Sequence, residues 1–206
     1  MIFHDYYTDI ARDDVDRFVQ SQEMGRLVTV GEDGTPHLGL YNFVYDGISL
    51  ELHLVRADEQ VADLKARPRC LFEVDEILAV IPSHWVHPEY AGSATAYHRT
   101  AIFECGGAVA EDPAEVLAQQ VRLLAKHQPE GGYRPLGVED PLYRGALGQL
   151  AAVRLQVTAV RPKFKLAQNR PVETRRKIIA LLRQRGRPGD GRAADAIEWT
   201  IDRQPS

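Results

Sequence analysis

Polar and cationic side chains gather in the segment KFKLAQNRP, residues 163–171. Its nine residues include two lysines, an arginine and the adjacent amides Gln168 and Asn169. Amide groups offer both hydrogen-bond donors and acceptors, and the lysines add positive charge, so the segment could hold a polar or anionic ligand. The alternative is the lead-in to a helix, in which Asn169 only caps the helix that follows.

A second candidate is HLVRADEQ, residues 53–60, where a strand pattern leads into a helix pattern. His53, Arg56 and the exposed backbone N–H groups of the helix start could together cradle a phosphate. The plain alternative is a half-buried strand histidine beside a surface arginine. The segment alone does not decide between them.

The segment HWVH places two imidazoles, His84 and His87, three residues apart. Such a pair could bind a metal or haem iron, but no Cys, Asp or Glu at ligand spacing completes a site, so no metal is expected. Trp85 and Tyr90 could wall an aromatic cofactor or pack at the end of a barrel. The sequence shows no dinucleotide fingerprint, phosphate loop or serine nucleophile elbow.

Charge is unevenly distributed along the sequence. Residues 161–187 contain ten Lys and Arg and one acid, Glu173, whereas the whole chain carries a net charge of −4. Such a basic block favours a phosphate-bearing ligand or nucleic acid, and a solvated helix face is the alternative.

Composition indicates one globular domain, or one domain with an appendage: 206 residues, 44% of them apolar and 26% charged. Cys70 and Cys105 lie in apolar strand-like runs, so we expect reduced core residues and a cytoplasmic protein. The first residues lack the features of a signal peptide, and no run approaches the length of a membrane span, so we expect a soluble protein with no membrane partner.

Strand patterns dominate the chain. Asp33-Gly34 and Asp46-Gly47 separate strand-like runs and predict a three-stranded meander. The predicted strands are 26–30, 36–45, 49–55, 70–74, 77–82, 101–110 and 150–160. About seven strands with few helices favour a mainly antiparallel sheet, closed into a small barrel with helices at its ends.

Helix patterns cover 13–24, 58–68, a segment from Asp112-Pro113 onward, and 172–185. Asp58 and Asp112 are the predicted N-caps of the second and third helices. The core face of the third helix is predicted to be Val116, Leu117, Val121 and Leu124. Gly186 ends the last helix, so we expect one domain over 1–185 and a poorly ordered or swapped tail over 186–206.

Three segments, in order, resemble the PaiB-like negative transcriptional regulators, a group within the FMN-binding split-barrel proteins related to pyridoxamine phosphate oxidase. LHLVRADEQ is similar to that group's Gly-His-x-Ala-Arg-x-Asn-x-Gln run at His53, Arg56 and Gln60. AVIPSHWVHPEY resembles its Tyr-Ile-Ser-Pro-Ser-Trp-Tyr segment at Ser83 and Trp85, in altered spacing. The most specific match is KLAQNR, which resembles the group's Lys-Leu-Ser-Gln-Asn-Arg signature.

The resemblance spans roughly residues 10–185 and implies a mainly β fold, an antiparallel split β-barrel with flanking helices. It also implies a homodimer that buries FMN at the subunit interface. In this reading Arg56 and Gln60 hold the phosphate, while Lys165, Gln168 and Asn169 face the flavin ring edge. The implied cofactor-binding residues are His53, Val55, Arg56, Ala57, Gln60, Ser83, Trp85, Lys165, Gln168 and Asn169.

The sequence departs from the pattern of this group in one segment and at two single residues. TAYHR, residues 95–99, stands where the group has Pro-Thr-Trp-Asn-Tyr, so the flavin face or substrate pocket is expected to differ there. Ala167 replaces a serine, and Asp58 stands where an asparagine is expected. An acid beside a phosphate site opposes anion binding unless it only caps the helix.

Three functions remain open. The first is a flavin-binding transcriptional regulator that contacts DNA through the basic helix 172–185, with the contacts Arg175, Arg176, Lys177, Arg183 and Arg185. The second is an FMN-dependent oxidoreductase that acts on a small molecule. Its catalytic residues are unknown, and its candidate polar groups are His53, His98 and Arg99. The third is a flavin-binding protein without turnover.

Overall fold

The structure is a computed structural model that describes residues 3–203. The chain divides into two compact units. Unit 1 comprises residues 1–15, 75–101 and 161–206, and unit 2 comprises residues 16–74 and 102–160. Each unit is therefore assembled from segments that lie far apart in the sequence.

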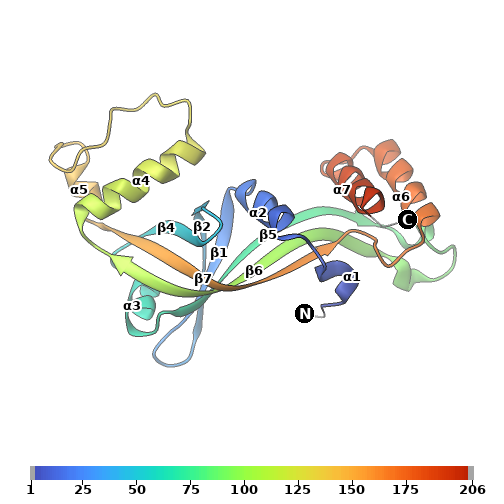
Figure 1. Ribbon diagram of the computed structural model, residues 1–206, viewed down its shortest axis with the longest axis horizontal. Helices are drawn as coiled ribbons and strands as arrows, with labels where there is room; N and C mark the ends of the chain where they lie inside the picture. The colour runs from blue at the N-terminus through green and yellow to red at the C-terminus, as the bar shows by residue number, and fades with distance from the viewer. Residues whose placement is uncertain (1–2, 204–206) are drawn as a thin grey trace. The chain divides into compact units, whose positions relative to one another are not determined.

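Seven strands form one antiparallel sheet in the order β2-β1-β5-β6-β7-β4-β3 (Figure 1). The three central strands are long and contribute residues to both units. The strands are β1 Met24–Val30, β2 Pro36–Asn42, β3 Val44–Tyr45, β4 Ser49–Val55, β5 Arg69–Ile81, β6 Thr95–Ala110 and β7 Leu150–Lys165. The mainly β, split-barrel class predicted from the sequence is confirmed.

The predicted closure of the barrel is wrong, because the sheet remains open between β2 and β3. These strands lie at opposite ends of the strand order, although only Phe43 separates them in the chain. The chain can pass so directly from one edge to the other only if the sheet curls back on itself. Phe43 lies in the chain between β2 and β3, and its ring is fully buried. This ring packs edge-on against Phe72, with 5.2 Å between the ring centroids.

The two Asp-Gly turns are confirmed, but the meander is wrong. Gly34 and Gly47 adopt φ values of +89° and +93°, and each lies between paired antiparallel strands, β1 with β2 and β3 with β4. The run 36–45 breaks at Phe43 instead of continuing as one strand. The two hairpins therefore lie at opposite edges of the sheet.

Three long strands were predicted too short. The runs 70–74 and 77–82 belong to the single strand β5, β6 begins at Thr95 and not at residue 101, and β7 continues five residues beyond the predicted end, to Lys165. The lysines of KFKLAQNRP consequently lie on a strand. Lys163 and Lys165 are two positions apart, so their side chains leave the same face of β7.

The helices are α1 Asp5–Thr8, α2 Arg12–Gln20, α3 Glu59–Ala66, α4 Pro113–His127, α5 Arg144–Leu147, α6 Val172–Arg185 and α7 Asp190–Asp202, with 3-10 turns η1 Ser83–Trp85 and η2 Ala91–Ser93.

Both predicted N-caps are confirmed, since the carboxylates of Asp58 and Asp112 accept backbone N–H groups of α3 and α4. The predicted core face of α4 is partly wrong, because Val121 is 48% exposed and Gln119 is buried instead. None of the described helices is both long and apolar enough to span a membrane.

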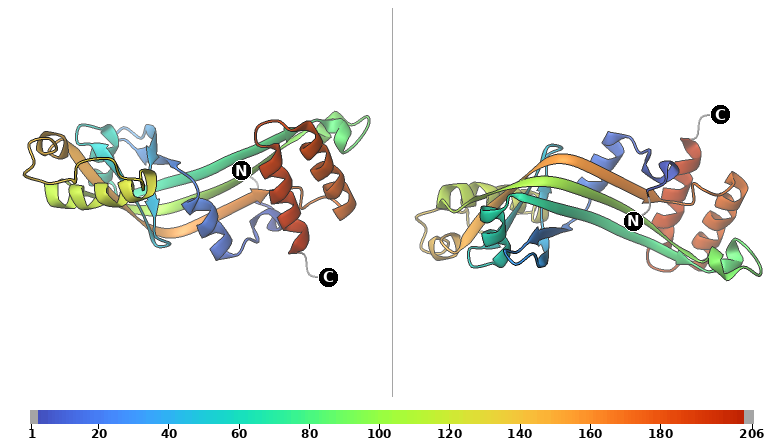
Figure 2. Two further views of the ribbon diagram at one scale, coloured as in Figure 1. Left: turned by 90° about the horizontal axis from the view of Figure 1, so that it is seen from above. Right: turned by 90° about the horizontal axis from the view of Figure 1, so that it is seen from below.

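The expectation of a poorly ordered tail is wrong. Gly186 ends α6 in the left-handed region with φ +63°, as predicted, but α7 follows and packs along α6 (Figure 2). Ala193, Ala194 and Ile197 of α7 are fully buried. The last segment is therefore an integral part of unit 1.

The two cysteines are buried and free, as predicted. Burial raises the pKa of Cys70 and of Cys105 to about 12, so both thiols stay protonated at neutral pH. A protonated, buried thiol is a weak nucleophile, and neither cysteine is a candidate for chemistry.

Candidate functional site

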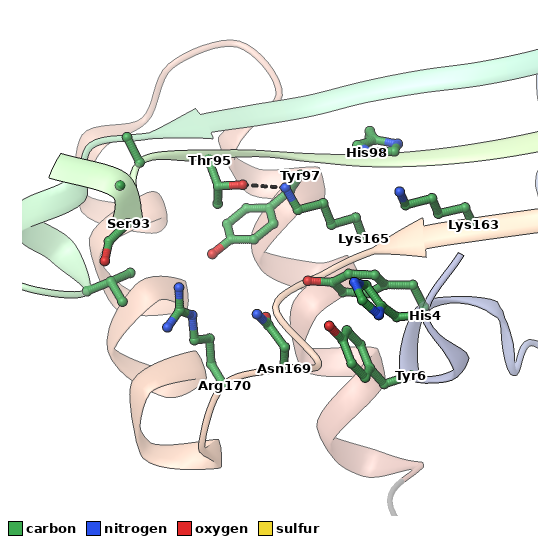
Figure 3. Close-up of a pocket in the computed structure, with 14 residues that line it drawn as sticks. His4, Tyr6, Ser93, Thr95, Tyr97, His98, Lys163, Lys165, Asn169 and Arg170 are labelled. Carbon is green, nitrogen blue, oxygen red and sulfur yellow. Dashed lines mark hydrogen bonds between the residues drawn. The ribbon is translucent and has the colours of Figure 1, made fainter. Parts of the chain in front are cut away.

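Unit 1 contains a cavity of about 390 Å³ that is lined by α1, the start of β6, the end of β7 and the loop between β7 and α6 (Figure 3). The lining combines cations, aromatic rings and small polar groups. Its residues are His4, Tyr6, Tyr7, Val86, Gly92, Ser93, Ala94, Thr95, Tyr97, His98, Lys163, Lys165, Asn169 and Arg170. We refer to it as the unit 1 cavity.

The lining is positively charged. Lys163, Lys165 and Arg170 contribute three cations, and no Asp or Glu is among the lining residues of the described chain. Burial, followed by the charges of Lys163 and Arg170, lowers the pKa of Lys165. Burial and the two lysines likewise lower the pKa of His98 against a smaller opposing effect of the Asp75 carboxylate, which favours the neutral imidazole at pH 7. The cavity is suited to an anion.

The TAYHR segment takes part in this lining. Thr95, Tyr97 and His98 all face the cavity, and Lys165 Nζ donates to Thr95 Oγ1 at 2.5 Å (Figure 3). Arg99 does not line the cavity, because its guanidinium donates to the buried carboxylate of Glu76. Of the two polar candidates in TAYHR, the structure therefore places only His98 at the site.

Gln168 shapes the loop between β7 and α6 without lining the cavity. Its Nε2 donates to the carbonyl of Phe164 at 2.6 Å, and its Oε1 accepts from the N–H of Leu166 at 2.7 Å. Ala167 between them has φ +65°, a left-handed conformation that costs a non-glycine residue about 1–2 kcal/mol. The bonds of Gln168 hold the chain in this unfavourable turn.

Asn169 has a different role from its neighbour. Its exposed side chain lines the unit 1 cavity beside Lys165 (Figure 3). The N-cap of α6 is Pro171, and no side chain caps this helix. The alternative in which Asn169 serves only as a helix cap is therefore wrong.

Ser83 and Trp85 lie on η1 in unit 1 but do not line the cavity. Trp85 is buried beneath the guanidinium of Arg185, which lies 4.8 Å from the ring centroid. His87 Nδ1 accepts the N–H of Tyr90 at 3.0 Å. Within residues 3–203, no three His, Cys, Asp or Glu residues gather to hold a metal ion.

The other predicted cofactor residues lie in unit 2, where β4 leads into α3. Gln60 is only 2% exposed, and its amide donates to the carbonyl of Leu27 and accepts from the hydroxyl of Tyr41. Arg56 donates to the carbonyls of Leu150 and Glu111. Both predicted phosphate ligands are thus engaged within unit 2, while the side chains of Val55 and Ala57 are exposed.

His53 differs from these neighbours because its Nδ1 is buried without a hydrogen-bond partner in the described chain. Burial lowers its pKa, which favours the neutral ring. An unpartnered buried polar atom is costly, so it marks a place where a ligand or water would bind. Asp58, in the same segment, is the N-cap of α3. The acid that was expected to oppose anion binding unless it caps the helix therefore has this structural role.

The structure thus brings Lys165 and Asn169 together in unit 1, and His53 through Gln60 along one segment of unit 2. The sequence did not single out two groups of lining residues: the aromatic side chains His4, Tyr6 and Tyr7, and the residues Val86, Gly92, Ser93 and Ala94. Lys163 and Arg170 belong to the predicted segment 163–171 but were not among the predicted cofactor contacts. Period-two spacing on a longer β7 would have grouped Lys163 with Lys165. The aromatic cluster HDYY was visible near the amino terminus, but only the folded chain shows that it faces the cavity.

The open antiparallel sheet with flanking helices belongs to a fold class known from solved structures. A conserved hypothetical protein, Rv2991, from Mycobacterium tuberculosis has a TM-score of 0.61 at 19% identity, over 83% of this chain and 94% of that chain. The flavocytochrome Anf3 from Azotobacter vinelandii has a TM-score of 0.61 at 12% identity, over 75% and 67%. A FAD and heme binding protein from Mycobacterium smegmatis has a TM-score of 0.59 at 17% identity, over 75% and 71%. At 12–19% sequence identity, this structural similarity establishes a shared fold and nothing about function.

The family is shown by the sequence itself. Residues 1–159 match the family described as "Putative FMN-binding domain", so the chain belongs to this FMN-binding family. The prediction of FMN as the cofactor is confirmed by this membership. No curated protein sequence matches the chain.

The residues of the structure fit an FMN group. FMN joins a phosphate to a planar ring system with a polar edge, and the unit 1 cavity offers cations, aromatic rings and the Asn169 amide without a carboxylate. The buried Nδ1 of His53, in unit 2, has no hydrogen-bond partner in the described chain and is available to bond to a ligand. Of the predicted residues, Lys165 and Asn169 line the unit 1 cavity, and His53 in unit 2 has a buried ring nitrogen without a partner in the described chain.

The hydrogen bonds of the β7–α6 loop predict different effects on stability for substitutions of the neighbouring residues Gln168 and Asn169. Gln168→Ala removes two bonds to the backbone and leaves the buried N–H of Leu166 unpaired, so we expect a loss of roughly 1–3 kcal/mol in the free energy of unfolding. Asn169→Ala, at an exposed side chain, should change it by less than about 0.5 kcal/mol. Urea denaturation of both variants measures this difference, and equal stabilities would contradict the role given to Gln168.

Proposed function

We propose that the protein is an FMN-dependent oxidoreductase that acts on a small molecule. The observation that carries the proposal is the unit 1 cavity, whose acid-free lining of cations and aromatic rings belongs to a chain of the FMN-binding family. The names of two solved neighbours, a flavocytochrome and a FAD and heme binding protein, support a redox role. When bound, FMN supplies the redox chemistry, and the protein supplies binding and orientation.

The residues of the cavity have distinct roles in this proposal. Lys165 and Asn169 hold the polar edge of the flavin, one by charge and the other by its amide. His98 is the candidate for proton transfer: its Nδ1 lies 3.1 Å from Thr100 Oγ1, and its Nε2 has no partner in the described chain. In unit 2, His53 has a buried Nδ1 without a partner in the described chain and stays a predicted ligand contact, whereas the guanidinium of Arg56 already donates to two backbone carbonyls.

This function predicts that NADH or NADPH bleaches the visible absorption of the FMN-loaded protein under anaerobic conditions. His98→Ala should slow the bleaching on the order of 10²-fold, the typical contribution of a positioned proton-transfer group, while FMN stays bound. Stopped-flow absorbance measures the rate. His84→Ala removes an exposed histidine outside the cavity and should leave the rate unchanged. A flavin that neither reductant bleaches would falsify the oxidoreductase proposal.

We also propose that the protein is a cytoplasmic homodimer. In unit 2, Val28 of β1 lies opposite Leu38 of β2 and Leu71 of β5, so the three side chains share one face of the sheet. On this face Leu38 is 65% exposed and Leu40 is 53% exposed. Exposed contiguous apolar side chains are typical of interaction surfaces, and a second copy of the chain is the proposed occupant.

A charge placed on this face should disrupt the dimer. We expect Leu38→Glu to shift the protein from dimer to monomer in sedimentation velocity, because an unpaired carboxylate would be buried in an apolar interface. Ile77→Glu alters an equally exposed apolar residue of unit 1 and should not affect the dimer. A Leu38→Glu variant that remains dimeric would place the interface elsewhere.

A PaiB-like transcriptional regulator is the second candidate function, supported by the exposed side chains of Arg176 and Lys177 on α6. The predicted DNA contact at Arg175 is wrong, because this side chain is only 2% exposed. Arg183 bonds to Glu198 at 2.7 Å, and Arg185 bonds to Asp190. The basic surface available to DNA is therefore much smaller than the sequence suggests.

Regulation predicts DNA binding that weakens with salt. Arg176→Ala should reduce the slope of log K against log salt by about one, as expected for one lost phosphate contact. Arg69→Ala removes an arginine of unit 2 that is highly exposed and should not change the slope. Fluorescence anisotropy with duplex DNA measures both, and the absence of binding at low salt would exclude this candidate.

A further inference from the structure

The unit 1 cavity has more positive charge than the proposed flavin contacts require. Lys165 and Asn169 serve the flavin in this proposal, whereas Lys163 and Arg170 line the same cavity and are not assigned to the flavin; the ammonium of Lys163 lies over the ring of Tyr7, 6.0 Å from its centroid. We propose that the unit 1 cavity binds a small aromatic anion, with Arg170 as the partner of the anionic group and Lys163 as a further positive charge of the lining. The inference rests on the proposed function and deepens it, because it makes small aromatic anions the substrate class.

Arg170 is positioned for a ligand by its backbone. Its N–H donates to the carbonyl of Ala167 at 2.9 Å, and its own carbonyl accepts from Nε of Arg175 at 3.1 Å. Its guanidinium lines the cavity and has no hydrogen bond or ion pair with another described residue (Figure 3). A half-buried cation without a counterion in the described chain is a ready partner for an anion, and the planar guanidinium can form two parallel bonds to a carboxylate or phosphate.

Aromatic rings lie among the cations of the cavity lining. His4 and Tyr6 stack with 5.1 Å between ring centroids and 11° between ring planes, and Tyr6 meets Tyr7 edge-on at 4.4 Å. Tyr97 adds a buried ring from β6, and burial raises its pKa, so its phenol stays a neutral donor. Flat rings bind well against such side chains, since aromatic pairs prefer stacked and edge-to-face arrangements.

Charge and shape together restrict the ligand. A cationic ligand would meet three like charges with no carboxylate in the lining to compensate, which disfavours it. A neutral aromatic ligand would leave the guanidinium of Arg170 desolvated and unpaired. A small aliphatic anion would leave the aromatic rings unused. A small aromatic anion matches both the positive charge and the aromatic rings of the lining.

The test measures binding to the FMN-loaded protein by calorimetry with four probes. Benzoate and phenyl phosphate carry both a ring and a charge, benzamide carries the ring alone, and acetate carries the charge alone. We expect benzoate or phenyl phosphate to bind at least about 10-fold more tightly than benzamide and acetate, which each lack one class of contact. Tighter binding of phenyl phosphate than of benzoate would support the proposal and narrow the anion to a phosphate ester.

Substitutions locate the site. Arg170→Gln and Lys163→Gln should each weaken binding of the aromatic anion by on the order of 10-fold, because each removes a charge-assisted contact. Lys177→Gln removes the same charge from an exposed position on α6, outside the cavity, and should have no effect. If Arg170→Gln lowers the stability of the fold, Lys163→Gln carries the test. Unchanged binding in the cavity variants would overturn the proposal.

Two outcomes separate this inference from the proposed function. Benzoate and phenyl phosphate that bind only to FMN-free protein would overturn the inference, because the flavin would then fill the cavity alone. Flavin fluorescence measures FMN binding independently of the calorimetry. Failure of FMN to bind would count against the oxidoreductase, while aromatic-anion binding lost in Arg170→Gln would still establish the anion site.

Discussion

The buried guanidinium of Arg175 joins the β7–α6 loop to α7. Its Nε donates to the carbonyl of Arg170 at 3.1 Å, and its Nη1 donates to Thr200 Oγ1 at 3.1 Å. A charge can be buried this deeply only while its donors find acceptors, because the desolvation of an unpaired ion is costly. The loop and α7 must therefore hold their positions together. The backbone position of Arg170 beside the cavity thus depends on α7 as well as on its own loop.

The acids of unit 1 determine what the basic block can do. Glu76 pairs with Arg99 and Arg192, Asp190 pairs with Arg185, and Glu198 pairs with Arg183. These carboxylates neutralise arginines outside the cavity, whereas the lining itself contains none. The positive charge of residues 161–187 is thereby divided into a structural part and a part that faces the cavity. Such a distribution suits a small anionic ligand better than the extended phosphate backbone of nucleic acid.

Local signals in the sequence predicted local structure well. The Asp58 and Asp112 caps and the turns at Gly34 and Gly47 depend on neighbouring residues, and each is found as predicted. Features that depend on distant contacts were missed, because pattern alone does not reveal them. The break of a continuous strand pattern at Phe43 follows from the curl of the sheet. The helical order of the last segment follows from packing of α7 on α6, although its Gly-rich start looks like a linker.

The candidate site was predicted in part for the same reason. Resemblance to a known signature identified Lys165 and Asn169, but it gave Gln168 the same role, and the structure shows that the amide of Gln168 supports the loop from within. Tyr6 and Arg170 line one cavity although more than half of the chain separates them in sequence. No period or spacing connects residues so far apart. Only the fold brings α1 to the end of β7.

One contact suggests how cofactor and ligand roles are divided within the unit 1 cavity. Lys165 belongs to the segment that resembles the PaiB-like signature, and Thr95 belongs to TAYHR, the segment that departs from it. Lys165 Nζ donates to Thr95 Oγ1, so the two segments meet at the cavity wall. A shared signature on one side fits a shared cofactor, and a different segment on the other side fits a different ligand. On the function proposed above, the departure at TAYHR leaves the cofactor contact of Lys165 in place and concerns the molecule that the flavin would meet.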